Sequence, residues 1–328
     1  MKQCLVEGAQ YQSRSAAISI ARLVSMLLIV ACHYLQYYNN GLAWWLNVGV
    51  QVFFVISGYL YGIRDIDNPL AFFKRVFPKI LVPYYTLLIV ILPFYLFCFP
   101  EFLSVKKVVG ILVCADTVKG LGHLWFVGYI LFCYLITPVL FWLRKTIPSE
   151  YSPIKVISVY IVILLLVQIL GSAYGSYFIP ARISCYLVGF FAADLVARYG
   201  SRVEKYILIV FFSAALLMSG MILSGRFDCI ENHLTLYNHL AMGVTLFFGL
   251  KTLFGNCTYS PLFLASDKYS YHIYLVHQIF ILSPFALMKA TVHPTVNVII
   301  SLAAIVLSGV VLQKIAAIVS RLMFYRSN

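Results

Sequence analysis

An apolar run of membrane-spanning length near the start of the chain, residues 18–35, carries two ionisable side chains, Arg22 and His33. Ionisable residues inside a span are costly, and they generally face a bundle interior or a water-filled cavity. In a helix the eleven-residue spacing puts both on one side, about 16 Å apart along the axis. A cation near one membrane face and a deeper imidazole would suit a ligand with a charged end and a reactive end. Alternatively, Arg22 reaches the lipid headgroups and His33 makes a buried hydrogen bond.

The rest of the chain is equally apolar. Of its 328 residues, 62% are hydrophobic and only 11% are charged, a composition that excludes a soluble domain. We therefore predict an all-α, polytopic integral membrane helix bundle in contact with the lipid bilayer. No loop is long enough for a soluble domain, so residues 1–328 are expected to form a single membrane domain. About ten transmembrane helices are predicted, at residues 18–38, 44–62, 77–99, 123–143, 154–171, 182–197, 205–224, 234–254, 270–288 and 295–320.

The distribution of positive charge predicts the orientation. A net charge of +13 would suggest nucleic acid as the partner of a soluble protein, but here it indicates cytoplasmic loops rich in Lys and Arg, and no nucleic-acid partner is expected. With both termini in the cytoplasm, seventeen Lys and Arg residues lie inside and six lie outside, while Arg22 lies within the first span. This split favours that orientation, which requires an even number of spans. The six outer residues are Lys106, Lys107, Lys119, Arg182, Arg226 and Lys289.

The eight cysteines do not form a recognisable site. No two of them lie within four residues of each other, and most are in or beside apolar runs. Such cysteines behave as small apolar side chains, so neither a metal site nor a set of disulfides is expected.

Two cations precede the third apolar run. Arg75 and Lys79 are four residues apart, so in a helix both project from one face, at the cytoplasmic boundary. Pro78 is expected at the first position of that helix. Two cations at a helix start would hold phosphate groups well. The alternative is an ordinary positive-inside signal.

Two other apolar runs contain a small-residue pair and an aromatic pair. Ser57 precedes Gly58, a pair that allows close approach and hydrogen bonding between helices, which is ordinary packing. His123 stands beside Trp125 on the predicted outer side, where an indole ring could stack on a sugar or simply anchor the interface.

The ninth predicted helix carries a polar stripe. Ser270, Tyr274 and His277 recur at spacings of four and three residues, which puts them on one face of an otherwise apolar helix. Such a stripe is expected to face the interior of the bundle.

Together these pieces resemble the acyltransferase 3 family of bacterial integral-membrane acyltransferases. The matching stretches follow the family's order. They are Arg22-x10-His33, Phe53-Phe54-Val55-Ile56-Ser57-Gly58-Tyr59, Arg75-xxx-Lys79 before Pro83-Tyr84, His123-Leu124-Trp125-Phe126 and Tyr274-Leu275-Val276-His277. Two departures stand out. Ser19-Ile20-Ala21 replaces the Asp or Asn and Leu that often precede the Arg, and Lys79 replaces an Arg, giving a point charge in place of a bidentate fork.

The resemblance implies acyl transfer from a thioester to a sugar hydroxyl, with His33 as the general base. Acetyl-CoA would enter from the cytoplasm with its phosphates on Arg22, Arg75 and Lys79. Direct transfer in a ternary complex and an acetyl-histidine intermediate both remain open. No carboxylate that orients His33 is identified; Asp194 is the only acid well inside a predicted span. The residues expected at the acceptor site are Ser57, His123, Trp125, Tyr274 and His277.

The implied acceptor is a surface glycan or a lipid-linked oligosaccharide precursor, and the implied location is the bacterial cytoplasmic (inner) membrane. Neither a metal nor any cofactor besides acetyl-CoA is expected, and a homodimer is possible. Two other function classes stay open. One is a transporter or flippase of glycans or acyl groups, although the sequence shows no internal repeats or paired broken helices. The other is an acyltransferase that acts on a small molecule.

Overall fold

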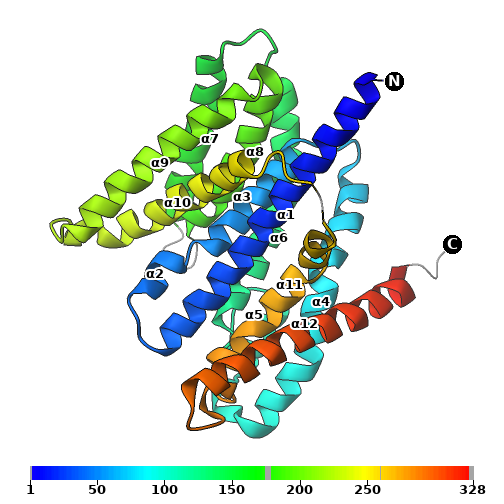
Figure 1. Ribbon diagram of the computed structural model, residues 1–328, viewed down its shortest axis with the longest axis vertical. Helices are drawn as coiled ribbons and strands as arrows, with labels where there is room; N and C mark the ends of the chain where they lie inside the picture. Colours follow the sequence, from blue (N-terminus) through cyan, green and yellow to red (C-terminus); the bar gives the residue numbers. More distant parts are fainter. Residues whose placement is uncertain (1, 174–178, 259, 325–328) are drawn as a thin grey trace. The chain divides into compact units, whose positions relative to one another are not determined.

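The computed structural model describes residues 2–173, 179–258 and 260–324, and every regular element in these ranges is a helix (Figure 1). The predicted all-α fold is confirmed. The α-helices are α1 (Lys2–Tyr37), α2 (Leu42–Leu46), α3 (Gly49–Gly62), α4 (Pro69–Cys98), α5 (Val105–Leu112), α6 (Trp125–Thr146), α7 (Pro153–Ser172), α8 (Pro180–Tyr199), α9 (Arg202–Leu223), α10 (Glu231–Leu253), α11 (Pro261–Ile281) and α12 (Pro294–Phe324). Short 3-10 turns are η1 (Pro100–Phe102), η2 (Gly122–Leu124), η4 (Asp228–Ile230) and η5 (Leu287–Lys289).

Helices occur at all ten predicted positions, and eight candidates in the described residues are long and apolar enough to cross a membrane. The helices α10 and α11 are not among these eight because polar residues interrupt their apolar sequences. Some bounds differ from the prediction. The second predicted helix is divided into α2 and α3, and the ninth begins nine residues earlier than expected, at Pro261.

The described helices pack into two compact units. Unit 1 is drawn from Met1–Ile29, Asn47–Asp67 and Ile136–Phe263, and unit 2 from Val30–Leu46, Asn68–Leu135 and Leu264–Asn328. Helix α1 is unbroken from Lys2 to Tyr37, so it contributes its first part to unit 1 and its last turns to unit 2.

In unit 1, α3 and α8 lie side by side and form the core (Figure 1). Every residue of α8 from Ile183 to Leu195 is buried. The two backbones come so close that a Cβ on Gly58 would lie 1.9 Å from the carbonyl oxygen of Tyr186. Only glycine fits there, which is the close approach that the sequence pair at Ser57 and Gly58 predicted.

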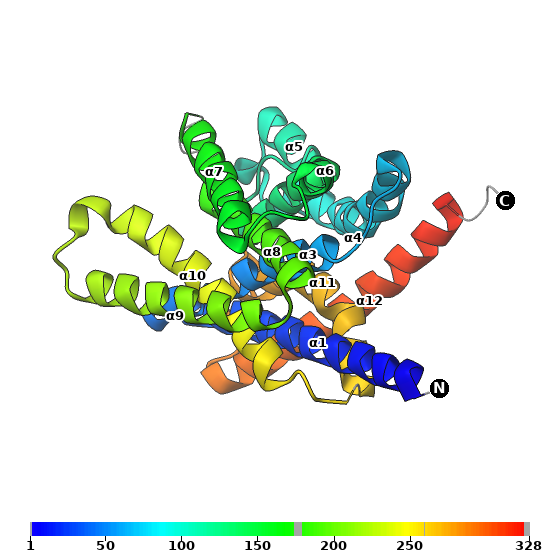
Figure 2. The same ribbon diagram turned by 90° about the horizontal axis from the view of Figure 1, so that it is seen from above.

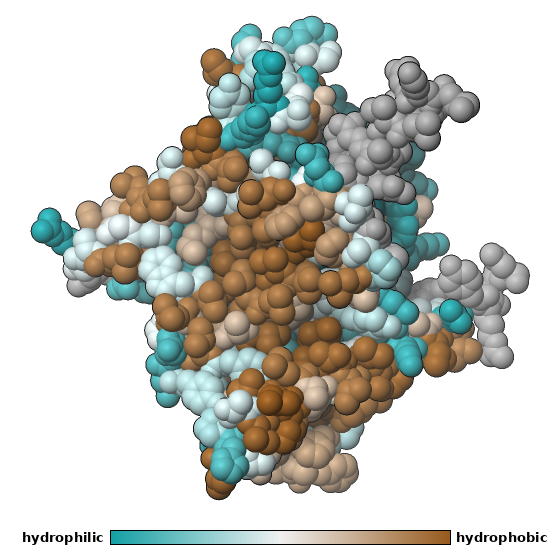
Figure 3. Space-filling view, viewed as in Figure 1, coloured by the Kyte–Doolittle hydropathy of each residue, from teal (hydrophilic) through white to brown (hydrophobic). Residues whose placement is uncertain are grey.

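The outer helices of unit 1 present apolar side chains to their surroundings. Helices α9 and α10 run side by side as a pair (Figure 2), and only Ala215 of α9 is buried. Large side chains such as Leu216 and Leu217 are exposed. Much of the visible surface is hydrophobic as well (Figure 3). Exposed apolar residues on long helices are typical of lipid-facing surfaces.

In unit 2, α4 packs against α12 and begins earlier than predicted. Asn68 caps the helix by accepting a hydrogen bond from the backbone N–H of Ala71 at 3.1 Å, and Pro69 follows at the first turn. The expectation that Pro78 begins this helix is therefore wrong: Pro78 lies inside α4. The capping asparagine and Pro69 provide the start signal instead.

The segment before α6 in unit 2 is held against α4 and α11. The hydroxyl of Tyr95 on α4 donates to the carbonyl of Lys119 at 2.7 Å. Gly120 has φ of +81°, and a Cβ there would lie 2.3 Å from Cα of Ser283. This glycine lets the chain turn tightly next to the residues that follow α11, which brings η2 and its histidine beside α11.

Candidate active site

Three histidines from three separate segments meet in unit 2. His33 lies in the last turns of α1, His123 in η2 and His277 in α11. The ring centroids of His33 and His277 are 5.0 Å apart, and those of His123 and His277 are 4.6 Å apart. The tertiary structure thus joins three motifs that are far apart in the sequence, and it puts three imidazoles within one small region.

His277 offers an open acceptor atom in the middle of this group. Its side chain is fully buried, and its Nδ1 lies 2.6 Å from the carbonyl oxygen of Tyr274. A carbonyl can only accept, so Nδ1 carries the proton and the lone pair is on Nε2. That Nε2 atom has no hydrogen-bond partner in the described part of the chain. An open, buried acceptor is costly, which makes it a natural place for a ligand's donor group.

His123, in contrast, is held by protein groups on all sides. Its backbone N–H donates to Oε1 of Gln278 at 3.0 Å, and the ring Nδ1 lies 2.8 Å from the same oxygen. The ring Nε2 lies 3.1 Å from the carbonyl of Leu275, and the hydroxyl of Tyr274 donates to the carbonyl of His123. The backbone N–H of His123, the Tyr274 hydroxyl and the single N–H of a neutral His123 ring fasten η2 to α11. His123 is therefore well placed to position the site, and its ring nitrogens both face protein atoms.

His33 is half-buried, so it is the most accessible of the three imidazoles. Its Nδ1 lies 2.6 Å from Oε1 of Gln36, one turn further along α1, and 3.5 Å from Nε2 of Gln278. In the described residues no hydrogen bond is found at its Nε2. A ring nitrogen that is open in an accessible imidazole can act as a base.

Sequence reasoning missed the two glutamines that surround His33. Gln36 carried a usable signal, because residues three apart on a helix are neighbours. Gln278 carried none, since it follows His277 directly and adjacent helical residues point in different directions. Its role becomes visible only when η2 and α11 are brought together.

The other predicted site residues lie as follows. Ser270 and Tyr274 are buried like His277, so the predicted polar stripe of α11 does face the interior. In unit 2, Arg75 and Lys79 are exposed on α4, which is helical around them, as their four-residue pairing requires. Trp125 is half-buried at the start of α6, with its ring 5.4 Å from that of Tyr129. Arg22 on α1 and Ser57 on α3 belong to unit 1.

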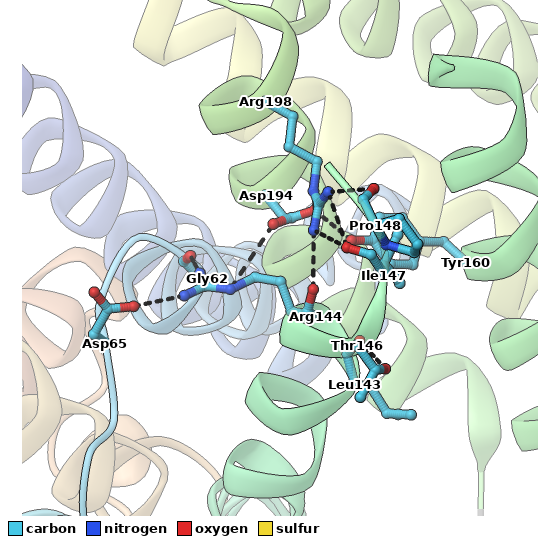
Figure 4. A network of polar contacts seen from close by, with 10 residues as sticks. All are labelled: Gly62, Asp65, Leu143, Arg144, Thr146, Ile147, Pro148, Tyr160, Asp194 and Arg198. Atoms are coloured by element: carbon cyan, nitrogen blue, oxygen red, sulfur yellow. Dashed lines mark hydrogen bonds and ion pairs between the residues drawn. The ribbon is translucent and has the colours of Figure 1, made fainter. Parts of the chain in front are cut away.

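The one acid predicted to lie well inside a span, Asp194, belongs to an ion network in unit 1 (Figure 4). Its carboxylate accepts from Nε of Arg198 at 2.7 Å and from the hydroxyl of Tyr160, and Nε of Arg144 is 3.8 Å away. Arg144 also pairs with Asp65 at 2.8 Å. The carboxylate is thus bound by cations from α6 and α8, which identifies it as a structural group of unit 1.

The same network fastens the ends of three helices. Arg144 near the end of α6 donates to the carbonyl of Gly62, the last residue of α3. Arg198 of α8 donates to the carbonyl of Arg144 at 2.9 Å. Cations that bond backbone carbonyls at helix C-termini also compensate the partial negative charge there.

Comparison with known proteins identifies the family. A family model described as an acyltransferase domain, Acyl_transf_3, matches residues 15–314, which is most of the chain and includes every motif discussed above. No curated protein and no solved structure matches the chain. Together with the apolar helices, the match makes this protein a multi-pass membrane acyltransferase. The chain belongs to the Acyl_transf_3 family of acyltransferase domains.

Proposed function

We propose that this acyltransferase moves an acetyl group from acetyl-CoA to a sugar hydroxyl of a surface polysaccharide or of its lipid-linked precursor. The observation that carries the proposal is the accessible imidazole of His33, with an open Nε2 and a second imidazole, His277, beside it. A hydroxyl is a poor nucleophile until a base removes its proton, and neutral imidazole does this near pH 7.

In the proposed reaction, His33 takes up one proton and then returns it. As the acceptor O–H bond breaks, a proton passes to Nε2 of His33 and the oxygen attacks the thioester carbonyl carbon. The C–S bond then breaks, and the coenzyme A thiolate takes the proton from the imidazolium. In the alternative route, Nε2 of His33 attacks the thioester carbonyl carbon and the C–S bond breaks, which releases the coenzyme A thiolate. The acceptor oxygen then attacks the acetyl-histidine, the acetyl–N bond breaks and returns its electron pair to Nε2, and the acceptor proton passes to the thiolate.

The donor is proposed to approach from the cytoplasm. Arg75 and Lys79 form an exposed cationic pair on α4, and Arg22 lies on the same unbroken helix as His33. Such cations suit the phosphates of coenzyme A because phosphate contacts are charge-assisted. The family resemblance supports the bacterial cytoplasmic membrane as the location, and with both termini inside, the glycan would be modified on the outer side of that membrane.

The acceptor is proposed to contact the aromatic and polar groups on the outer side. Trp125 would stack on a sugar ring, and the open Nε2 of His277 would accept a hydrogen bond from a sugar hydroxyl. Tyr274 and His123 would support these contacts through the hydrogen bond that the Tyr274 hydroxyl donates to the His123 carbonyl. Among family members, the motifs resemble those of the enterobacterial common antigen O-acetyltransferase, which supports a glycan as the acceptor.

Mass spectrometry of surface glycans tests this proposal. Glycans from cells with the gene, without it, and with His33→Gln are compared. We expect an acetyl-sized mass increase only with the wild-type gene. A mass difference of another size would identify another acyl group, and glycans identical in all three strains would favour a small-molecule acceptor or a transporter.

A further inference from the structure

The ring of His33 is held by amides where a catalytic histidine is commonly held by a carboxylate. Its Nδ1 atom lies between Oε1 of Gln36 at 2.6 Å and Nε2 of Gln278 at 3.5 Å. The shorter distance is that of a good hydrogen bond, while the longer one is at the limit. Gln36 is therefore the partner that fixes this nitrogen.

The orientation of both amides follows from their neighbours. The backbone N–H of His123 can only donate, so the atom of Gln278 that receives it at 3.0 Å is the oxygen. The NH₂ group of Gln278 is then the atom that points to His33. If Gln36 also presented its NH₂ group, two donors would compete for a single lone pair on Nδ1. The short 2.6 Å contact is satisfied when Gln36 presents its oxygen and Nδ1 carries the proton, and the 3.5 Å approach of the Gln278 NH₂ group is then not a hydrogen bond.

We propose that Gln36 is the positioning residue of His33. Its amide oxygen accepts a hydrogen bond from Nδ1–H and so keeps the lone pair on Nε2, which takes the proton from the hydroxyl of the sugar substrate. This inference rests on the proposed function of His33. The bond persists when Nε2 takes up the proton, because the imidazolium still donates from Nδ1 to Gln36. Gln36 can thus accept this hydrogen bond from both the neutral and the protonated ring of His33.

A neutral partner has a chemical consequence. In a Ser-His-Asp triad a carboxylate fixes the tautomer and also stabilises the imidazolium. An amide fixes the tautomer without adding a negative charge, so it does not stabilise the imidazolium as a carboxylate would. The titratable groups packed against His33 within unit 2 are the imidazoles of His277 from α11 and, next to it, His123 from η2. Both can only oppose a further positive charge.

Two substitutions of Gln36 separate positioning from packing. Acetyl transfer from acetyl-CoA to glycan extracted from cells lacking the gene is measured over a range of pH. Gln36→Leu removes the acceptor, and we expect kcat to fall about tenfold with little change in KM, which is the order of one hydrogen bond. Gln36→Glu keeps an acceptor and adds a charge, so we expect kcat to recover and the acid limb of the pH profile to move to higher pH.

Gln168→Leu is the matched control. Gln168 in unit 1 is bonded to Ser184 at 2.6 Å and to Tyr237, so its removal also costs side-chain hydrogen bonds, but it does not touch a histidine of the site. We expect kcat and the pH profile of this variant to match the wild type. Wild-type kcat and an unchanged pH profile in both Gln36 variants would overturn the proposal.

The tautomer can also be read without any substrate. In protein labelled with ¹⁵N-histidine and held in nanodiscs, the signals of His33 are assigned by their loss in His33→Gln. We expect the neutral ring to be protonated at Nδ1 in the wild type, and at Nε2 in a larger fraction of Gln36→Leu. A wild-type ring protonated at Nε2 would refute the positioning role, even where His33→Gln is inactive. Conversely, if the wild-type ring is protonated at Nδ1 but His33→Gln is active, the function proposed for His33 is refuted and the contact with Gln36 stands.

Discussion

The rings of His33 and His277 lie 5.0 Å apart, one half-buried and the other fully buried with an open Nε2. Neither residue's neighbours in the sequence reveal this pairing, since 243 residues separate the two and the contact joins α1 to α11. It places an accessible imidazole next to an acceptor atom that no described protein group satisfies, which is the arrangement that a hydroxylic substrate would complete.

The first prediction concerns His277. We expect His277→Gln to reduce kcat by at least about tenfold, because an amide does not reproduce the open imidazole nitrogen beside His33. The control is His272→Gln on the same helix, whose ring also has a buried nitrogen, Nδ1, without a partner in the described residues. The ring of His272 contacts that of Tyr271, and its loss should leave kcat near the wild-type value. Equal losses in the two variants would show a general effect of buried histidines.

The second prediction concerns His33. Replacing a general base typically costs about 10²–10⁴ in rate, so His33→Gln should abolish measurable transfer. The amide is similar in size and can keep a hydrogen bond to Gln36, so the thermal unfolding midpoint in detergent should stay close to that of the wild type. A folded His33→Gln protein with near wild-type turnover would make His33 structural and turn attention to His277.

The third prediction concerns the donor. Arg75→Glu should weaken coenzyme A binding by about tenfold or more, because a charge-assisted phosphate contact is replaced by a repulsive one. Lys314→Glu is the control, since Lys314 is also exposed in unit 2 but lies outside the motifs. Calorimetric titration of each variant with coenzyme A measures the effect. Similar affinities in the two variants would mean that the basic pair on α4 is only a topology signal.

The fourth prediction concerns the acceptor. Trp125→Ala should raise the KM for the acceptor about threefold to tenfold, the range expected for the loss of one aromatic stacking contact. Trp142 is the control: it lies on the same helix, is 63% exposed, and is placed at the opposite end, where it would anchor the interface. Steady-state kinetics with Trp142→Ala should give the wild-type KM. An unchanged KM in a stable Trp125→Ala protein would exclude the stacking role.

The fifth prediction concerns the ion network of unit 1. Asp194→Asn leaves Arg198 and Arg144 without their buried anion, so the free energy of unfolding should fall by about 3 kcal/mol. Asp65 pairs with the same Arg144, but its side chain is 73% exposed, so Asp65→Asn should cost less than about 1 kcal/mol. Denaturant titrations in detergent compare the two. A smaller loss for Asp194→Asn than for Asp65→Asn would contradict the structural role of the network.

The sequence by itself determined the class of fold and the family motifs. The apolar runs are long enough for a helix to cross the hydrocarbon core of a bilayer, and a helix satisfies its backbone hydrogen bonds internally there, so the sequence predicted helices. The pairing of small residues at Ser57 and Gly58 likewise indicated a close helix contact, because glycine alone permits it. The start of α4 was misjudged because Pro78 is tolerated within a long apolar helix, while the capping signal lies ten residues earlier, at Asn68.

The tertiary structure decided which polar residues meet. The sequence offered His33, His123 and His277 as separate candidates, and only packing of η2 and α11 against the end of α1 makes them neighbours. It also distinguished them: both ring nitrogens of His123 face protein oxygens, His277 keeps an open Nε2, and His33 is accessible. Gln278 entered the site in the same way. Asp194 was assigned to an ion network because its partners come from other helices, and long-range contacts of this kind leave no periodic signal in a sequence.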